Sequence, residues 1–249
     1  MKNIHIFTNN NYIVKILSKF FTIKKIFTQQ EKVFAPLSIW NSKIQVINKL
    51  DKISKKDFKD VSMAISYGFG IIFKKEFIKK YSGGIWNIHP GDLPKYRGRH
   101  PISWAFLKNE KKIGICIHII NEKIDRGFLL AKKFISRTYK DDEETIKKKI
   151  LKKIPKVLKL AIQNFKNNKL IYIKKSNYHK SLAGGIKIKN AKNYEYLFIY
   201  NVIKAQKCHG GPIIENINFK DVLFFSKKNI KKKNKVIMCK NKKKLIGIL

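Results

Sequence analysis

The chain is organised around residues 85–128, IWNIHPGDLPKYRGRHPISWAFLKNEKKIGICIHIINEKIDRGF. The apolar run that opens this stretch is typical of a buried strand, but it ends in the polar side chains of Asn87 and His89. Alternate residues of an extended strand share a face, so we expect both side chains to emerge together. A Pro/Gly-rich loop, a short helical pattern and a second apolar run then lead to Asp125, beside Gly127. The pattern predicts a hydrogen-bond donor and a proton-transfer group at the rim of a sheet.

The segments before this stretch alternate between strand and helix patterns. Strand-like apolar runs lie at residues 3–8, 23–27, 44–48 and 63–67, and helical patterns at 12–20 and 73–80. This alternation predicts an α/β fold with an open, doubly wound, mostly parallel Rossmann-like sheet. Ligands of such sheets bind at the carboxyl ends of strands, where Asn87, His89 and the Tyr67–Gly68 turn all fall. No G-x-G-x-x-G follows the first strand, which argues against NAD(P) binding.

The second half of the chain begins with further strand patterns and a long helical pattern, and then changes to short strand patterns. Apolar runs predict strands at 113–119 and 128–135, and an acidic start at 141–144 predicts a long helix that Pro155 kinks. Beyond residue 169, short strand patterns lie at 170–173, 186–188, 222–225 and 235–238, with one helical pattern at 195–205. We therefore expect a main domain at residues 1–169 and a small β-rich C-terminal domain at 170–249.

The charge of the chain admits two interpretations. Its 249 residues carry a formal net charge of +40, which would suit a polyanionic partner such as nucleic acid. Arg occurs only at positions 97, 99, 126 and 137, so nearly all the positive charge is Lys, and Asn and Ile are also abundant. The codon bias of an A/T-rich genome produces that composition whatever the function. We favour this second interpretation, although the two can coexist.

The cysteine residues and the hydropathy of the chain indicate the cellular compartment in which we expect the protein. Three widely spaced Cys residues suit reduced thiols in a cytoplasm better than a disulfide framework, and no set of Cys and His has the spacing of a metal site. No apolar run approaches the roughly 20 residues that span a bilayer, and the N-terminus lacks the pattern of a signal peptide. We expect a cytoplasmic protein with no bound metal and no membrane partner.

Asn87, His89 and Asp125 suggest acyl-transfer chemistry. A His can take or give a proton near neutral pH, a nearby carboxylate favours its charged form, and an Asn amide can donate to a developing oxyanion. No Ser or Cys nucleophile stands in the same loops, so the group suits direct transfer to an incoming nucleophile without a covalent enzyme intermediate. The alternative is a loop His held by hydrogen bonds and a turn Asp, with no chemistry.

Two motifs, NIHPGDLPKYRGRHPISWA at 87–105 and HIINEKIDRG at 118–127, resemble the folate-dependent formyltransferases. These enzymes transfer a formyl group from N10-formyltetrahydrofolate to an amine, and their doubly wound fold agrees with the order of elements above. The resemblance makes His89 the catalytic acid/base, Asn87 the stabiliser of the oxyanion and Asp125 the group that holds His89 charged. It places the folate co-substrate on Ile71, Ile72, Phe73, Arg99, Asn121, Glu122, Lys123, Ile124 and Asp125.

The resemblance leaves the acceptor amine open. The loop at 97–104 is most similar to the enzymes that formylate a nucleotide-linked amino sugar for surface-polysaccharide (lipopolysaccharide) biosynthesis, and it implies that Lys95, Arg97 and His100 bind the acceptor. Methionyl-tRNA is the alternative acceptor, because the chain is so basic. A non-catalytic module that binds folate or nucleotide is the second alternative. A homodimer is left open.

Two further residues have competing interpretations. His118 sits in an apolar strand, where a hydrogen-bonded core residue is favoured over a part in the reaction. Arg126 stands where many relatives carry a small residue, and it could either pair with Asp125 or point to solvent.

Overall fold

The computed structural model describes residues 2–30, 42–229 and 234–249. The chain divides into two compact units, each assembled from three segments. The first unit comprises Met1–His89, Ile115–Lys133 and Leu151–Ser176, and the second Pro90–Gly114, Phe134–Ile150 and Asn177–Leu249. The expected domain boundary between residues 169 and 170 stays a prediction.

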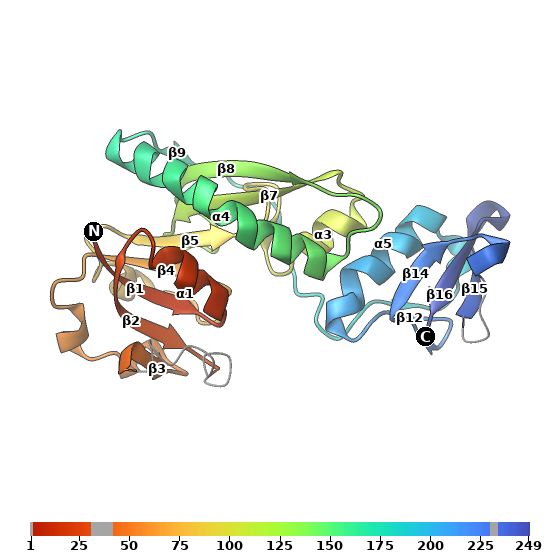
Figure 1. Ribbon diagram of the computed structural model, residues 1–249, viewed down its shortest axis with the longest axis horizontal. Helices are drawn as coiled ribbons and strands as arrows, with labels where there is room; N and C mark the ends of the chain where they lie inside the picture. Colours follow the sequence, from red (N-terminus) through yellow and green to blue (C-terminus); the bar gives the residue numbers. More distant parts are fainter. Residues whose placement is uncertain (1, 31–41, 230–233) are drawn as a thin grey trace. The chain divides into compact units, whose positions relative to one another are not determined.

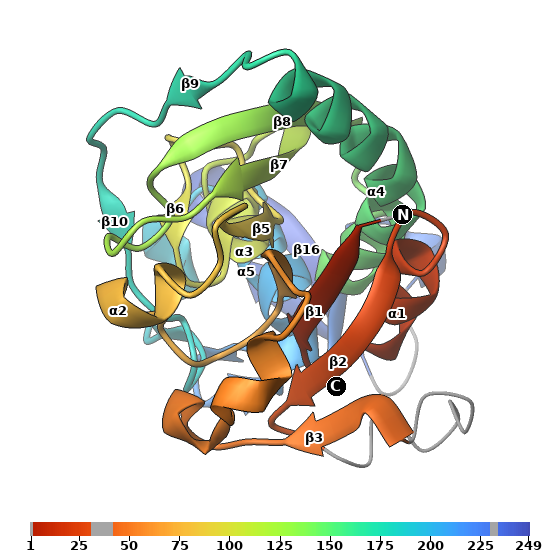
Figure 2. The ribbon, with the colours of Figure 1, turned by 90° about the vertical axis from the view of Figure 1, so that its left-hand side faces the viewer.

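The main sheet has eight strands among the described residues (Figure 1). Their spatial order is β3 (Ile44–Val46), β2 (Thr22–Thr28), β1 (Asn3–Thr8), β4 (Met63–Tyr67), β5 (Ile85–His89), β7 (Lys112–Ile119), β8 (Phe128–Ser136) and β9 (Ile171–Tyr172). The strands from β3 to β5 are parallel, and β7 then pairs antiparallel with β5. The order 3-2-1-4-5 reverses its direction at β1, so the expected doubly wound, mostly parallel sheet is confirmed. Figure 2 shows β3, β2 and β1 side by side.

The remaining elements are five α-helices, several 3₁₀ turns and three small sheets within the described residues. The helices are α1 (Asn11–Leu17), α2 (Lys75–Ile78), α3 (Pro101–Leu107), α4 (Glu143–Lys166) and α5 (Tyr196–Gln206). The 3₁₀ turns are η3 (Leu50–Lys52), η4 (Lys55–Phe58), η5 (Ala191–Asn193), η6 (Lys207–His209), η7 (Lys227–Asn229) and η8 (Lys240–Lys242). The small sheets join β6 (Arg97–Gly98) to β10 (Tyr178–His179), β11 (Lys187–Ile188) to β12 (Ile213–Ile214) and β13 (Ile217–Asn218), and β14 (Asp221–Phe224) to β16 (Lys244–Ile248) and β15 (Asn234–Met238).

Aromatic side chains fill one core of the first unit. Phe7 of β1 stacks on Phe27 of β2 with ring centroids 5.0 Å apart, and Phe73 and Phe77 close over them from the segment around α2. The expected helix at 73–80 is a single turn, Lys75–Ile78, and the buried Phe77 within it faces this core. Burial of these rings, rather than helix length, therefore fixes the segment that leads into β5.

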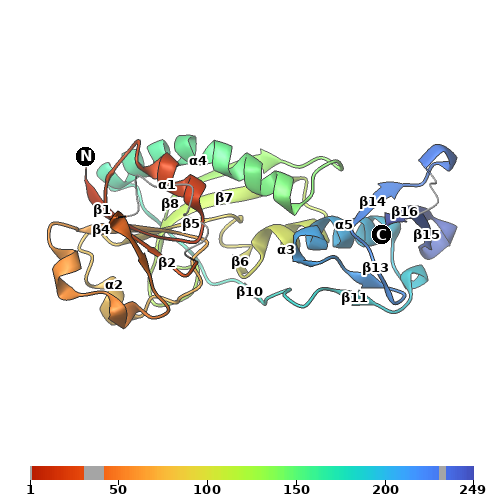
Figure 3. The ribbon, with the colours of Figure 1, turned by 60° about the horizontal axis from the view of Figure 1, so that its bottom comes forward.

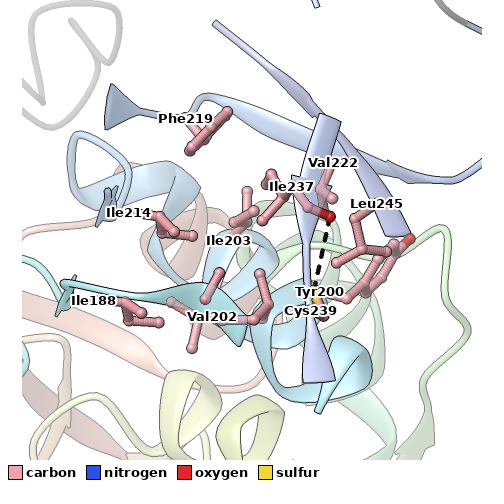
Figure 4. Packing of buried hydrophobic residues seen from close by; sticks show 12 residues of the cluster. Ile188, Tyr200, Val202, Ile203, Ile214, Phe219, Val222, Ile237, Cys239 and Leu245 are labelled. Atoms are coloured by element: carbon pink, nitrogen blue, oxygen red, sulfur yellow. Dashed lines mark hydrogen bonds between the residues drawn. The ribbon is translucent and has the colours of Figure 1, made fainter. Parts of the chain in front are cut away.

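The core of the second unit lies between α5 and the sheet of β14–β16 (Figures 3 and 4). Figure 4 shows Val202 and Ile203 of α5 in one cluster with Ile214, Val222 and Ile237 of the strands, and all five residues are at most 2% exposed. This core confirms a small β-rich region near the C-terminus. No helix in the described part of the chain combines the length and apolar composition that a membrane span requires.

Candidate active site

Asn87 and His89 stand at the carboxyl end of β5, on the same face of the sheet. On the β7 side, Asn87 pairs with His118 and His89 with Cys116. Directly paired residues of neighbouring strands share a face, so the amide and the two imidazoles gather there. The His89 side chain is only 5% exposed, so the strand presents a histidine that is largely shielded from water.

Asp125 reaches this face from the loop between β7 and β8. Its backbone adopts a φ of +51°, and Gly127 adopts +103° where the loop closes against Ile119. The side chain of Asn121 accepts a hydrogen bond from the Lys123 backbone N–H at 3.0 Å, which tightens the same loop. The compact loop holds the 11% exposed side chain of Asp125 against β5.

His89 and Asp125 form an ion-pair contact, with 3.4 Å between His89 Nδ1 and Asp125 Oδ1. Both side chains are largely buried, so water screens their attraction little. The carboxylate can therefore orient the ring and stabilise a proton on it. The three residues that the sequence singles out are thus gathered on one face, as a group able to move a proton beside an amide.

His118 joins this group through two hydrogen bonds that the sequence pattern does not reveal. Its Nε2 lies 3.2 Å from Asn87 Nδ2, and its Nδ1 lies 3.1 Å from the backbone oxygen of Arg126. Burial lowers the pKa of His118 to about 4, so the ring is neutral near pH 7. The favoured interpretation of a hydrogen-bonded core residue agrees with these contacts. The link depends on the register of β7 against β5, which the sequence pattern does not specify.

Arg126 has a buried Nε without a hydrogen-bond partner among the described residues. The residue as a whole is half-buried, so the two interpretations weighed from the sequence, a pair with Asp125 and a side chain that points to solvent, stay predictions.

The predicted folate residues of the first unit lie in two loops. Phe73 is buried in the aromatic core with Ile71 packed against that core, whereas Ile72 is 59% exposed. Gly70 anchors this loop by donating its backbone N–H to Gln29 Oε1 at 2.8 Å. The other loop is the one that carries Asp125, and in it Ile124 is 39% exposed. Each loop thus offers one large apolar side chain to a ligand, and Glu122 and Lys123 are exposed beside Ile124.

The remaining predicted residues belong to the second unit. Lys95 pairs with Glu110 at 2.5 Å between Nζ and Oε1, and Arg97 is buried within β6. Arg99 donates its backbone N–H to the His179 oxygen at 3.0 Å, and His100 accepts at Nδ1 from the Leu182 backbone at 3.1 Å.

His100 has a neighbour that sequence reasoning missed. Its ring stacks on His209 at 4.8 Å, and the His209 Nε2 atom lies 3.2 Å from the buried carboxylate of Glu143. Burial, followed by the charge of His209, lowers the pKa of His100. The two histidines are 109 residues apart in the sequence, so no local pattern could have paired them.

Comparison with known sequences supports one family. Residues 14–162, more than half of the chain, match the family model described as formyl transferase. A methionyl-tRNA formyltransferase of Prochlorococcus marinus (strain AS9601) is 33% identical over 159 residues, which cover 61% of this chain and 46% of that protein. A methionyl-tRNA formyltransferase of Borrelia garinii subsp. bavariensis is 32% identical over 201 residues, covering 78% of this chain and 59% of that protein. The chain spans about half the length of the curated relatives it matches.

Solved structures share the fold along the whole chain. An N-formyltransferase from Helicobacter canadensis, in complex with folinic acid and dTDP-3-aminofucose, superposes with a TM-score of 0.75 at 21% identity and covers 100% of this chain and 99% of its own. WlaRD, a sugar 3N-formyl transferase crystallised with dTDP and 5-N-formyl-THF, gives a TM-score of 0.70 at 22% identity, covering 100% and 97%. At these identities the likeness establishes the fold. Together with the family match, it shows that this chain belongs to the formyl transferase family.

Proposed function

We propose that this chain transfers the formyl group of N10-formyltetrahydrofolate to a primary amine, with Asn87, His89 and Asp125 as its catalytic residues. The observation that carries the proposal is the contact of His89 Nδ1 with Asp125 Oδ1 at 3.4 Å. His89 stands two residues beyond Asn87 on the same strand, so the amide lies beside this pair. Membership of the formyl transferase family supports it. So do the folate compounds named for two solved structures of the same fold.

Each of the three residues has one task in this reaction. As the amine nitrogen attacks the formyl carbon, Asn87 donates a side-chain N–H to the oxygen that becomes negatively charged. His89 takes the proton that the amine loses and delivers it to N10 of the folate, so that the bond between carbon and N10 can break. Asp125 orients the His89 ring and stabilises its charge. The products are a formamide and tetrahydrofolate.

The folate donor would occupy two loops of the first unit, residues 70–73 and 121–125. Exposed Ile72 and Ile124 supply apolar contacts for a flat ring, which suits a pterin. Asp125 lies in the same loop as Ile124, so binding there brings the formyl carbon to the catalytic residues. The full proposed donor set is Ile71, Ile72, Phe73, Arg99, Asn121, Glu122, Lys123, Ile124 and Asp125.

For the acceptor we favour a nucleotide-linked amino sugar, a substrate of surface-polysaccharide synthesis. The support is structural similarity to the two solved N-formyltransferases. Each superposition covers the whole of this chain and nearly the whole of the other chain. Lys95, Arg97 and His100 would bind the phosphates and the sugar.

Methionyl-tRNA is the second candidate acceptor. The curated relatives at 32–33% identity are methionyl-tRNA formyltransferases, and a net charge of +40 attracts nucleic acid.

The test is to incubate the full chain with N10-formyltetrahydrofolate and one acceptor at a time. The acceptors are a dTDP-3-amino sugar, a dTDP-4-amino sugar and charged methionyl-tRNA, and the readouts are released tetrahydrofolate and the mass of the formylated product. We expect turnover with an amino sugar. Turnover with methionyl-tRNA alone would reassign the acceptor, and turnover with none would refute the enzymatic proposal.

Isosteric variants test the catalytic residues. Asp125→Asn removes the carboxylate charge, and we expect it to lower kcat by about 100-fold or more. Asp60→Asn is the matched control, because Asp60 is an exposed aspartate of the first unit whose φ of +61° resembles that of Asp125. Near-normal rates for Asp125→Asn, or equal losses in both variants, would rule out the assigned role.

A further inference from the structure

His118 connects the two halves of the candidate active site. It lies in β7 directly opposite Asn87, and its ring is completely buried. One ring nitrogen faces the Asn87 side chain at 3.2 Å, and the other faces the backbone oxygen of Arg126 at 3.1 Å. Arg126 directly follows Asp125, so a single ring contacts the amide on β5 and the loop that carries the carboxylate.

The protonation of this ring follows from its partners. A backbone oxygen can only accept, so Nδ1 of His118 carries the hydrogen and donates it to Arg126. Of the charged groups facing the ring, Asp125 favours its protonation and His89, with ring centroids 6.4 Å apart, opposes it. Burial outweighs both and lowers the pKa to about 4. The ring is therefore neutral, and its Nε2 presents a lone pair.

That lone pair determines how the Asn87 amide is turned. Nδ2 of Asn87 donates one of its two hydrogens to His118 Nε2. Rotation of the amide by 180° would set Oδ1 against the lone pair, which is repulsive. The second hydrogen of Nδ2 consequently stays available to another acceptor, in a fixed direction.

We propose that His118 is a positioning residue of the formyl-transfer site, which fixes the Asn87 amide as a donor and anchors the loop of Asp125 through Arg126. The proposal rests on the proposed function, because it is the oxyanion that needs this donor. His118 itself touches no substrate. It acts by preventing the amide from presenting an oxygen where an N–H is required.

A double-mutant cycle in kcat separates positioning from a merely structural role. Asn87→Ala should lower kcat by about 100-fold or more. His118→Asn, which lacks an acceptor that reaches Asn87, should lower kcat by up to about tenfold, the worth of one hydrogen bond. In the Asn87→Ala background the same change should have no further effect, because its target is gone. Equal losses in both backgrounds would overturn the proposal.

A conservative variant keeps the test decisive if His118→Asn folds poorly. His118→Gln places an amide oxygen close to the position of Nε2, so it retains an acceptor for Asn87. We expect it to recover most of the lost kcat with KM for the folate donor unchanged within about twofold. Thermal melting of each variant reports stability separately. A His118→Gln protein that is folded yet as slow as His118→Asn would contradict the proposal.

A second readout does not depend on turnover. In the ¹⁵N-histidine-labelled chain, NMR should find His118 in the Nδ1–H tautomer between about pH 5 and 8. An Nε2–H tautomer, or titration near 6.5, would overturn the proposal even in an active enzyme. The expected tautomer in a chain that formylates no acceptor would instead refute the proposed function, and with it the role of His118 in that reaction.

Discussion

Gly127→Ala is the perturbation whose consequence the structure specifies most fully. Gly127 has a φ of +103°, and a Cβ built on it would lie 2.0 Å from the backbone oxygen of Ile119. Real Cβ atoms essentially never come within 3.0 Å of another heavy atom, so one of the two backbones has to move by at least 1 Å. Neither backbone is the flexible end of a side chain. The loop that carries Asp125 therefore has to shift.

Two costs follow from that shift. The positive φ costs a non-glycine residue about 1–3 kcal/mol of folding free energy, and the steric overlap adds about 1–3 kcal/mol. Displacement of the loop by about 1 Å also separates Asp125 from His89, and a misplacement of that size can lower kcat about 100-fold. We expect both losses in Gly127→Ala.

The matched control is Gly184→Ala. Gly184 has a similar φ of +93°, but a Cβ there would meet no atom within 4 Å. Urea unfolding should show the free-energy cost of the positive φ in both variants and the cost of the steric overlap in Gly127→Ala alone. The formyl-transfer assay should find a loss of kcat only in Gly127→Ala. Equal destabilisation of the two variants, or full activity in Gly127→Ala, would refute this reasoning.

Two further predictions concern buried ionisable groups. Burial lowers the pKa of His5 and of His118 to about 4, so their contribution to stability is complete above about pH 6.5 and is lost as the pH falls toward 4. For His118 the loss is about 2 kcal/mol between about pH 7 and 5, measurable by urea unfolding, and a flat profile would disprove it. Burial opposes ionisation of Glu143, yet its partners, His209 foremost, lower its pKa to about 2. Glu143→Gln should therefore cost about 3 kcal/mol at neutral pH, and the exposed Glu144→Gln less than about 0.5 kcal/mol; similar losses would argue against the buried network.

Local patterns predicted the parts of the fold that depend on neighbouring residues. The first and fourth strands of the sequence have the expected bounds, residues 3–8 and 63–67, because continuous apolar runs between polar turns define buried strands. The common face of Asn87 and His89 follows from the two-residue period of a strand. The expected helix at 73–80 was too long, because packing of Phe73 and Phe77 into the aromatic core left only one turn.

The sequence by itself determined which side chains could do chemistry, since the identities and spacing of Asn87, His89 and Asp125 are local facts supported by the family resemblance. Only the tertiary structure decided what holds them. The antiparallel pairing of β5 with β7 sets His118 opposite Asn87, and the turn at Gly127 brings Asp125 to His89. The contacts of Asn87 with His118 and of His89 with Asp125 join residues more than 30 positions apart, and such contacts leave no periodic signal in the chain.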